Sequence, residues 1–178
     1  MTDRKARYEV VLAGSGGQGL VVSGMMVAEA AMLEGKNVVQ TVSYGIATRG
    51  GFSMAEVIID TDEIIFQQVQ KVDIALVLTE EAMEKFSSLA EEGASVFYDS
   101  TLVKPREGNR LFGYPFLEMA SGIGNAGTAN TIALGLIARK TGMVLPESIA
   151  EVLRGRFAGK VLTMNMTALQ KGMELAAK

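Results

Sequence analysis

The sequence predicts an α/β fold, a three-layer α/β/α arrangement around a mainly parallel sheet, in one domain over residues 1–178. Short runs rich in β-branched and aromatic residues alternate with longer helical segments, which is typical of parallel α/β domains. The first of these runs leads directly into a glycine-rich loop and a helix, which is the Rossmann-like arrangement. No internal repeat, low-complexity tract or linker divides the chain.

The first strand, the first helix and the second strand are predicted from apolar runs and from the residues that end them. Residues 8–13 (YEVVLA) predict a buried strand, and a helix is expected over residues 18–33. Because this helix is apolar on nearly all sides, we expect it to be covered on more than one side. Gly35 is its expected stop, and residues 37–42 (NVVQTV) form the second strand.

The middle of the chain continues this alternation. Strands are expected over residues 54–59 and 73–78, and the second of these leads into a helix over residues 80–91. Residues 95–99 (SVFYD) predict another strand, and residues 110–114 a weaker one.

The last third of the chain is predicted to be helical. Asn125 is a suitable N-cap for a helix over residues 126–141. Pro146 suits the first turn of the next helix. A final helix is expected to open at Met164 or Asn165.

The composition excludes several kinds of chemistry. The chain has no cysteine and no histidine, which rules out Cys/His zinc sites, cysteine-ligated iron–sulfur clusters, disulfides and Ser-His-Asp or Cys-His nucleophile systems. Its 17 basic and 20 acidic residues give a net charge of -3, whereas nucleic-acid binders normally carry a basic patch. Any catalysis would need carboxylates, Lys, Tyr or groups from another chain.

The sequence predicts a cytoplasmic protein. The short apolar run that follows the basic start is too short for a secretory signal. The longest membrane-like stretch, residues 20–28, is interrupted by Ser23 and Gly24 and is far shorter than the roughly 20 residues of a spanning helix.

The loop after the first strand has the Gly-x-Gly-x-x-Gly spacing, filled by Gly14, Gly16 and Gly19. Such glycines permit a tight turn and close approach of the backbone to a phosphate at a helix N-terminus. A dinucleotide site also requires an acidic residue at the end of the second strand, where this sequence has QTV (residues 40–42). Three interpretations stay open: nicotinamide or flavin binding, contact with an anion or another backbone, and a purely structural turn.

A second glycine-bearing segment, residues 44–51, follows the second strand directly. It contains Tyr44, Arg49, Gly50 and Gly51, at a position where α/β sheets usually place ligand sites. The guanidinium of Arg49 could present a planar fork to a carboxylate or phosphate beside open backbone. The alternative is a loop whose arginine pairs with a local acid.

A stretch of small residues, 122–130, runs into the helix expected over residues 126–141. Small residues on the following helix face, such as Gly135, permit close approach of another backbone, and we favour internal helix packing over a ligand site. Asn125 and Asn130 carry amides that need partners in apolar surroundings. The eleven methionines and the apolar first helix are compatible with a sizeable subunit interface.

Several motifs occur together in an order that resembles one known family. GSGGQG (residues 14–19) follows the first strand, and VVQT (38–41), SYG (43–45) and RGG (49–51) follow in turn, with Asn130 further along. With this combination, the sequence resembles the gamma subunit of 2-oxoacid:ferredoxin oxidoreductases over essentially its whole length.

The Arg-Gly-Gly form at residues 49–51 resembles the 2-oxoglutarate and branched-chain ketoacid (ketoisovalerate) enzymes, whereas pyruvate enzymes tend to have Arg-Gly-Ala-Pro there. Ile46 and Ala47 stand where closer relatives usually have Pro-Glu. Indolepyruvate oxidoreductases carry a similar domain and are an alternative within the superfamily.

The resemblance implies a division of labour in which this chain binds no cofactor alone and is not active alone. In such complexes, thiamine diphosphate lies between alpha and beta subunits, and cysteine-bearing chains, including a ferredoxin-like delta subunit, hold iron–sulfur clusters. The complex oxidatively decarboxylates a 2-oxoacid, transfers the acyl group to coenzyme A and passes two electrons to ferredoxin. Whether the isolated chain forms a homodimer is a question that the resemblance does not answer.

We expect this chain to shape the coenzyme A side of the cleft, without a catalytic or metal-binding residue of its own. The residues expected at the cofactor are Gly14, Gly16, Gly17, Gln18, Gly19, Tyr44, Arg49, Gly50, Gly51 and Asn130. Two interpretations from other classes stay open: a free-standing dinucleotide- or flavin-binding oxidoreductase, and an assembly protein whose glycine loops contact only a partner backbone.

Overall fold

A computed structural model of the chain describes residues 5–44 and 51–177 and places their strands in one six-stranded sheet of order β2-β3-β1-β4-β5-β6. The strands are β1 (Arg7–Ser15), β2 (Asn37–Tyr44), β3 (Phe52–Asp60), β4 (Ile74–Val77), β5 (Ser95–Asp99) and β6 (Leu111–Tyr114). β1, β4, β5 and β6 pair in parallel, whereas β3 is antiparallel to both β1 and β2. The sheet is therefore mixed and mainly parallel, and the α/β prediction is confirmed.

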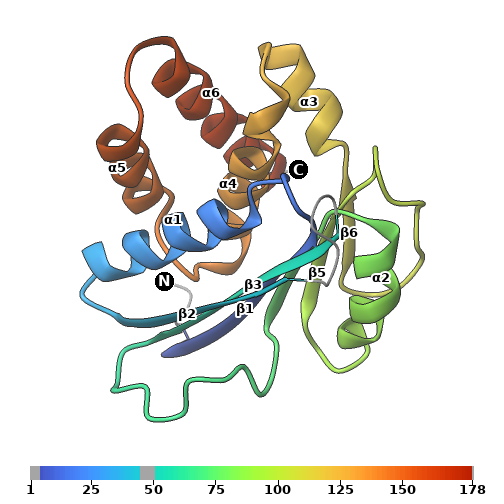
Figure 1. Cartoon of the computed structure of the whole chain (residues 1–178), viewed down its shortest axis with the longest axis vertical. Coiled ribbons are helices and arrows are strands. Elements are labelled where there is room, and N and C mark those ends of the chain that lie inside the picture. The colour runs from blue at the N-terminus through green and yellow to red at the C-terminus, as the bar shows by residue number, and fades with distance from the viewer. Residues whose placement is uncertain (1–4, 45–50, 178) are drawn as a thin grey trace.

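Helices cover both faces of the sheet (Figure 1). They are α1 (Leu20–Leu33), α2 (Glu80–Phe86), α3 (Phe116–Ile123), α4 (Ala129–Thr141), α5 (Pro146–Arg156) and α6 (Gly159–Leu175), with 3₁₀ turns η1 (Ser87–Ala90) and η2 (Ala126–Thr128). Because side chains alternate along a strand, Val10 and Leu12 of β1 enter the core beneath α1, α4 and α5. Val11 and Ala13 enter the second core, beneath α2. This arrangement fits the predicted three layers.

Helix α1 begins two residues later than predicted, and it is covered by the sheet on one side and by α5 and α4 on another. Gly19 adopts a left-handed conformation at its N-cap (φ 72), and Gly35 (φ 74) follows its end as expected. Residues such as Met26 and Val27 are buried, but Met32 and Leu33 are 65% and 60% exposed. The expectation that α1 is covered on more than one side is therefore confirmed, and one further side of the helix stays exposed in the described chain.

The C-terminal helices differ from the prediction at two places. Asn125 caps η2, accepting a hydrogen bond from the Gly127 amide at 3.0 Å, and α4 starts only at Ala129. The final helix, α6, opens at Gly159 rather than at Met164 or Asn165. Asn165 lies inside that helix because its side chain is buried against α4 and accepts a 2.8 Å hydrogen bond from Thr131.

Two further local differences involve helices in the middle of the chain. The helix expected over residues 80–91 is divided into α2 and η1, and α3 was not predicted. The capping threonine of α2, Thr79, accepts a 3.2 Å hydrogen bond from the Ala82 amide, as an N-cap does.

Glycines bring α4 and α6 into close contact. A Cβ at Gly135 would overlap the Leu169 carbonyl oxygen, and one at Gly172 would overlap the Ile132 carbonyl oxygen. The small residues of α4 therefore serve internal packing, as we favoured from the sequence. Within the described residues, no helix combines the length and the apolar character needed to cross a membrane.

Candidate functional site

A pocket of about 480 Å³ lies at the carboxyl edge of the parallel strands, which we call the glycine-loop pocket. Its lining residues are Gly17, Gln18, Gly19, Val22, Leu78, Asp99, Leu102, Leu117, Ala126, Gly127, Ala129 and Asn130. The chain leaves β1 toward α1 on one face of the sheet and leaves β4 toward α2 on the other. Such a switch between neighbouring parallel strands opens a crevice at their carboxyl ends, where α/β proteins bind ligands.

Gln18 ties the glycine loop, residues 14–19, to the end of β4. Its side-chain Oε1 accepts a 2.7 Å hydrogen bond from the Ser15 amide, and its Nε2 donates to the Leu78 carbonyl at 3.1 Å. A Cβ at Gly14 would overlap the same Oε1, so glycine at that position leaves the space that the Gln18 side chain fills. The loop is therefore held in place by one of its own side chains.

Asn130 holds the other side of the glycine loop. Its Nδ2 lies within hydrogen-bond distance of the carbonyl oxygens of Gln18 (3.2 Å) and Gly19 (3.3 Å) and of the Ser23 hydroxyl (3.0 Å). The N-terminal turn of α4 is thus attached to that of α1. The structure brings this sequence-predicted residue to the loop, and the partners that its amide was expected to need are present.

The glycine loop also meets the segment that follows β2. The Gly16 amide donates a 2.9 Å hydrogen bond to the Gly51 carbonyl, next to the start of β3. Tyr44 ends β2 and is 71% exposed. Arg49 and Gly50 lie outside the described residues. Two motifs about 30 residues apart in the sequence therefore share one edge of the sheet.

Gly17, Gln18 and Gly19 of the loop line the pocket. The amides of Ser15, Gly16 and Gln18 donate within the chain. Gly17 (φ 94) is exposed, and nothing lies within 4 Å of the position that a Cβ would take. Beside it, the first turn of α1 has amides without intrahelical partners and carries the positive end of the helix dipole. This backbone can accept a negatively charged or hydrogen-bond-accepting group.

Other lining residues of the glycine-loop pocket were not predicted from the sequence to be site residues. Asp99, at the end of β5, is buried, and its carboxylate accepts hydrogen bonds of 2.9 Å from the amides of Thr101 and Leu117. It therefore attaches the start of α3 to the sheet. Leu78 and Leu102 add apolar surface. Ligand sites in α/β proteins lie at the carboxyl ends of parallel strands. The aspartate at the end of β5 is therefore the signal in the sequence that could have identified this position.

The neighbour of β1 differs from that in dinucleotide-binding folds. There the second parallel strand pairs directly with the first and presents an acid to the ribose. Here antiparallel β3 lies between β1 and β2, and Ser15 at the end of β1 pairs with Phe52 at the start of β3. The end of β2 is therefore displaced from the glycine loop by one strand, which does not favour nicotinamide binding.

The described residues form no cluster of acidic side chains suited to a metal ion. Among the described residues, no group of three or more Asp or Glu side chains could hold a metal ion, and the sequence has no Cys or His.

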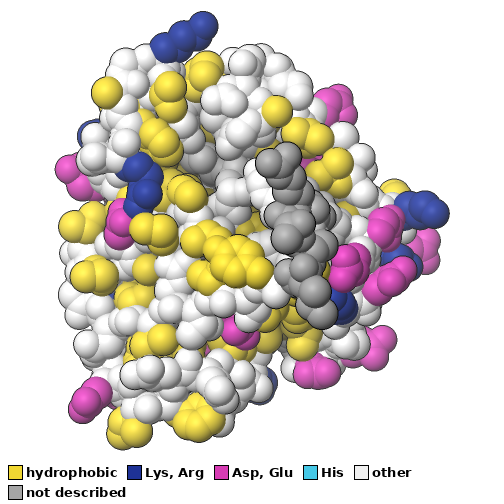
Figure 2. Space-filling view, in the orientation of Figure 1, with side chains coloured by type: hydrophobic (Ala, Val, Ile, Leu, Met, Phe, Trp, Pro, Cys, Tyr) yellow, Lys and Arg dark blue, Asp and Glu magenta, His cyan; other side chains and the backbone are white. Residues whose placement is uncertain are grey.

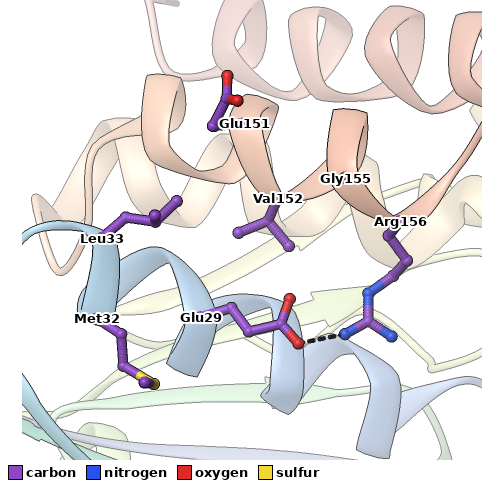
Figure 3. Close-up of a pocket in the computed structure, with 7 residues that line it drawn as sticks. All are labelled: Glu29, Met32, Leu33, Glu151, Val152, Gly155 and Arg156. Carbon is purple, nitrogen blue, oxygen red and sulfur yellow. Dashed lines mark hydrogen bonds and ion pairs between the residues drawn. The ribbon is translucent and has the colours of Figure 1, made fainter.

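A second pocket, of about 510 Å³, lies at the far end of α1 against α5 (Figure 3).

The chain matches the family model described as pyruvate ferredoxin/flavodoxin oxidoreductase over residues 9–175. It is 40% identical over 170 residues to the 2-oxoglutarate synthase subunit KorC of Archaeoglobus fulgidus, covering 94% of this chain and 87% of that protein. It is 34% identical to the ketoisovalerate oxidoreductase subunit VorA of Methanothermobacter thermautotrophicus, covering 94% of this chain but 36% of that protein.

The fold is also found in a solved structure. The gamma subunit of a keto/oxoacid ferredoxin oxidoreductase from Geobacter sulfurreducens superposes with a TM-score of 0.82 and 34% sequence identity. The match covers 96% of this chain and 98% of the other. The similarity thus extends over the whole arrangement of strands and helices that forms the glycine-loop pocket.

Proposed function

Because the chain belongs to the pyruvate ferredoxin/flavodoxin oxidoreductase family, we propose that it is the gamma subunit of a 2-oxoglutarate or branched-chain 2-oxoacid:ferredoxin oxidoreductase. Relatives named as subunits of 2-oxoglutarate synthase and ketoisovalerate oxidoreductase support both the enzyme class and the two substrate candidates. In this proposal the chain is one cytoplasmic domain, residues 1–178, that acts with alpha, beta and ferredoxin-like delta subunits and with ferredoxin as electron acceptor.

The chemistry of the complex is divided among its subunits. When bound between the alpha and beta subunits, thiamine diphosphate supplies decarboxylation of the 2-oxoacid. In the assembled complex, the 2-oxoacid would lose CO2, its acyl group would form the thioester of coenzyme A with release of the thiol proton, and the iron–sulfur clusters of the partner chains would carry the two electrons to ferredoxin. This chain has no cysteine for a cluster and no histidine, so its part is to bind and to orient.

The glycine-loop pocket is the part of this chain that we assign to coenzyme A. The observation that carries this assignment is the exposed backbone of Gly17 beside the N-terminus of α1, at the carboxyl edge of the sheet. A Rossmann-like loop of this kind suits a phosphate, and coenzyme A carries several. Gln18 and Asn130 would fix the loop, and Tyr44 and Gly51 would border it from the segment after β2. Arg49 and Gly50, outside the described residues, are included because of the sequence resemblance.

The experiment is reconstitution of the complex from an alpha–beta–delta preparation and purified gamma chain. Initial rates of ferredoxin reduction are measured against coenzyme A at saturating 2-oxoacid, and against 2-oxoacid at saturating coenzyme A. Arg49→Ala should raise KM for coenzyme A by about 10- to 150-fold, since a charge-assisted contact contributes roughly 1.5–3 kcal/mol, and should leave KM for the 2-oxoacid unchanged. Arg139→Ala, an exposed arginine in the last turn of α4, is the matched control.

The alternative functions would give different results in experiments on the same preparation. A dinucleotide- or flavin-binding enzyme would show a thermal shift with NAD(P) or purify with a coloured cofactor. An assembly protein would bind alpha–beta without changing turnover. An indolepyruvate oxidoreductase subunit would support ferredoxin reduction with indolepyruvate. If Arg49→Ala altered neither assembly nor the coenzyme A dependence, the coenzyme A assignment would be abandoned.

A further inference from the structure

The outer side of α1 carries four exposed apolar side chains, Val22, Met25, Met32 and Leu33, which we call the α1 stripe. Their exposed fractions are 39%, 38%, 65% and 60%. Single exposed apolar residues are ordinary, but several on one side of a helix are typical of a protein interface. The row is interrupted by Glu29, whose side chain is 44% exposed and is paired with Arg156. Figure 2 shows hydrophobic side chains gathered over this part of the molecule.

At its C-terminal end the α1 stripe borders the pocket between α1 and α5, which we call the α1–α5 groove. Met32 and Leu33 line it from α1, and Val152 and Gly155 line it from α5 (Figure 3). Its lining is mainly apolar. The stripe therefore ends in a recess that can receive an apolar side chain from another protein.

The charges of the groove are paired within the chain. Glu29 bonds Arg156 at 2.5 Å (Figure 3), and Glu151 bonds Arg154 at 3.0 Å. Because each pair is neutral, the groove offers little attraction for a nucleic acid, an acidic peptide or an anionic lipid surface. It suits an uncharged, apolar protein surface.

One polar atom in the groove is left unsatisfied. The Nε of Arg156 is buried and, within the described residues, has no hydrogen-bond partner. Buried donors of this kind are normally paired. A partner chain that displaces the Arg156 side chain slightly could supply a carbonyl oxygen to it.

The α1 stripe is continuous with the candidate site. Val22, its first residue, also lines the glycine-loop pocket. A protein that lies along the stripe would therefore reach that pocket and add a wall to it. In the proposed complex, the acyl group passes to coenzyme A from thiamine diphosphate at the alpha–beta boundary. The chain that meets the glycine loop is therefore the subunit that binds thiamine diphosphate there.

In one relative, the region that resembles this chain is part of a longer polypeptide. That region is 36% of the ketoisovalerate oxidoreductase subunit of Methanothermobacter thermautotrophicus. The KorC relative matches this chain over 87% of its own length. A domain that is not joined covalently needs a noncovalent interface, typically about 800 Å² on each side.

We propose that the α1 stripe and the α1–α5 groove dock the thiamine-diphosphate-binding partner subunit through a largely uncharged, apolar contact. This inference rests on the proposed function and specifies where on this chain the partner binds. A charge placed in the middle of that contact would be buried without a partner and would weaken association.

The test uses Leu33→Glu and Met32→Glu in the co-expressed complex, with Ile65→Glu as the matched control. Ile65 is 89% exposed on the segment between β3 and β4, outside the stripe and both pockets. Retention of the gamma chain on the tagged thiamine-diphosphate-binding subunit and the Kd of the purified chains are measured. We expect a rise in Kd of at least tenfold for the two stripe variants and less than twofold for the control.

Three other results would overturn the inference. The first is an unchanged Kd for both stripe variants, with melting temperatures like that of the wild type. The second is an equal loss in the control. The third is sedimentation showing that Leu33→Glu separates a dimer of this chain without affecting its retention in the complex. Wild-type complex that assembles but shows no 2-oxoacid-dependent ferredoxin reduction would instead contradict the proposed function.

Discussion

The side-chain amide of Asn130 donates to the carbonyl oxygen of Gly19 at 3.3 Å, and a Cβ at Gly19 would lie 2.6 Å from that amide nitrogen. Glycine at this position therefore satisfies two requirements: a left-handed backbone (φ 72) and space for a side chain from α4. The contact joins residues that are 111 positions apart in the sequence.

Gly19→Ala should destabilise the protein more than the same change at Gly17. Both glycines have a positive φ, which costs an alanine about 1–3 kcal/mol, but only Gly19 contacts Asn130 within 4 Å. Urea denaturation measures the difference in the free energy of unfolding. Gly35→Ala is the control for backbone strain away from the pocket, since Gly35 has φ 74 and nothing within 4 Å of its Cβ position. Equal losses at Gly19 and Gly35 would show that the Asn130 contact contributes nothing.

Asn130→Asp should be more destabilising than Asn130→Ala. The aspartate keeps the size of the side chain but places a carboxylate oxygen against the carbonyl oxygens of Gln18 and Gly19, whereas alanine only removes the donor. We expect a loss of about 1–3 kcal/mol for alanine and a larger one for aspartate. Thermal and urea unfolding of the two variants decide the order. Reversal of that order would mean that the amide does not act as a donor here.

Gly172→Ala should separate α4 from α6 and lower stability by about 1–3 kcal/mol, as overpacking does. The added methyl would overlap the Ile132 carbonyl oxygen, and backbone cannot move aside as a flexible side chain can. Gly122→Ala in α3 is the control, because nothing lies within 4 Å of its Cβ position. That change should be neutral or stabilising by up to about 1 kcal/mol. Melting temperatures of both variants provide the comparison.

Glu9 should make the stability of the protein sensitive to acid. Burial raises the pKa of this carboxyl, but hydrogen bonds from the amides of Lys71 and Gln70 and from Arg7 outweigh it and lower the pKa below its ordinary value. A carboxyl with a lowered pKa stabilises the fold at pH values above its unfolded pKa of about 4.3. That contribution is lost as the pH falls through the folded-state pKa.

The measurement is urea denaturation of wild type and Glu9→Gln at pH 7 and at several values below pH 4.5. The wild type should be more stable at pH 7, and the difference should shrink as the pH falls. A difference that is independent of pH would show that the ionised carboxylate is not responsible. Glu81→Gln, in an exposed pair with Lys85, is the matched control and should change little at any pH.

Local sequence patterns predicted most elements because their causes are local. The strand over residues 95–99 was predicted with the bounds that the structure has, since an apolar run and an aspartate delimit it. Asn165 was misassigned as a helix opening because an asparagine favours N-caps when it has no other partner. Here Thr131 supplies that partner, and the helix continues through the position.

The α/β class, the glycine loop at the end of the first strand and the exclusion of cysteine- and histidine-based chemistry follow from the amino-acid sequence alone. Composition and short-range periodicity are sufficient for these, because each depends on residues close together in the chain. Three features became visible only in the folded chain: β3 lies between β1 and β2, Asn130 holds the glycine loop, and one side of α1 is exposed. These depend on packing between distant segments, whose pairing no local pattern specifies.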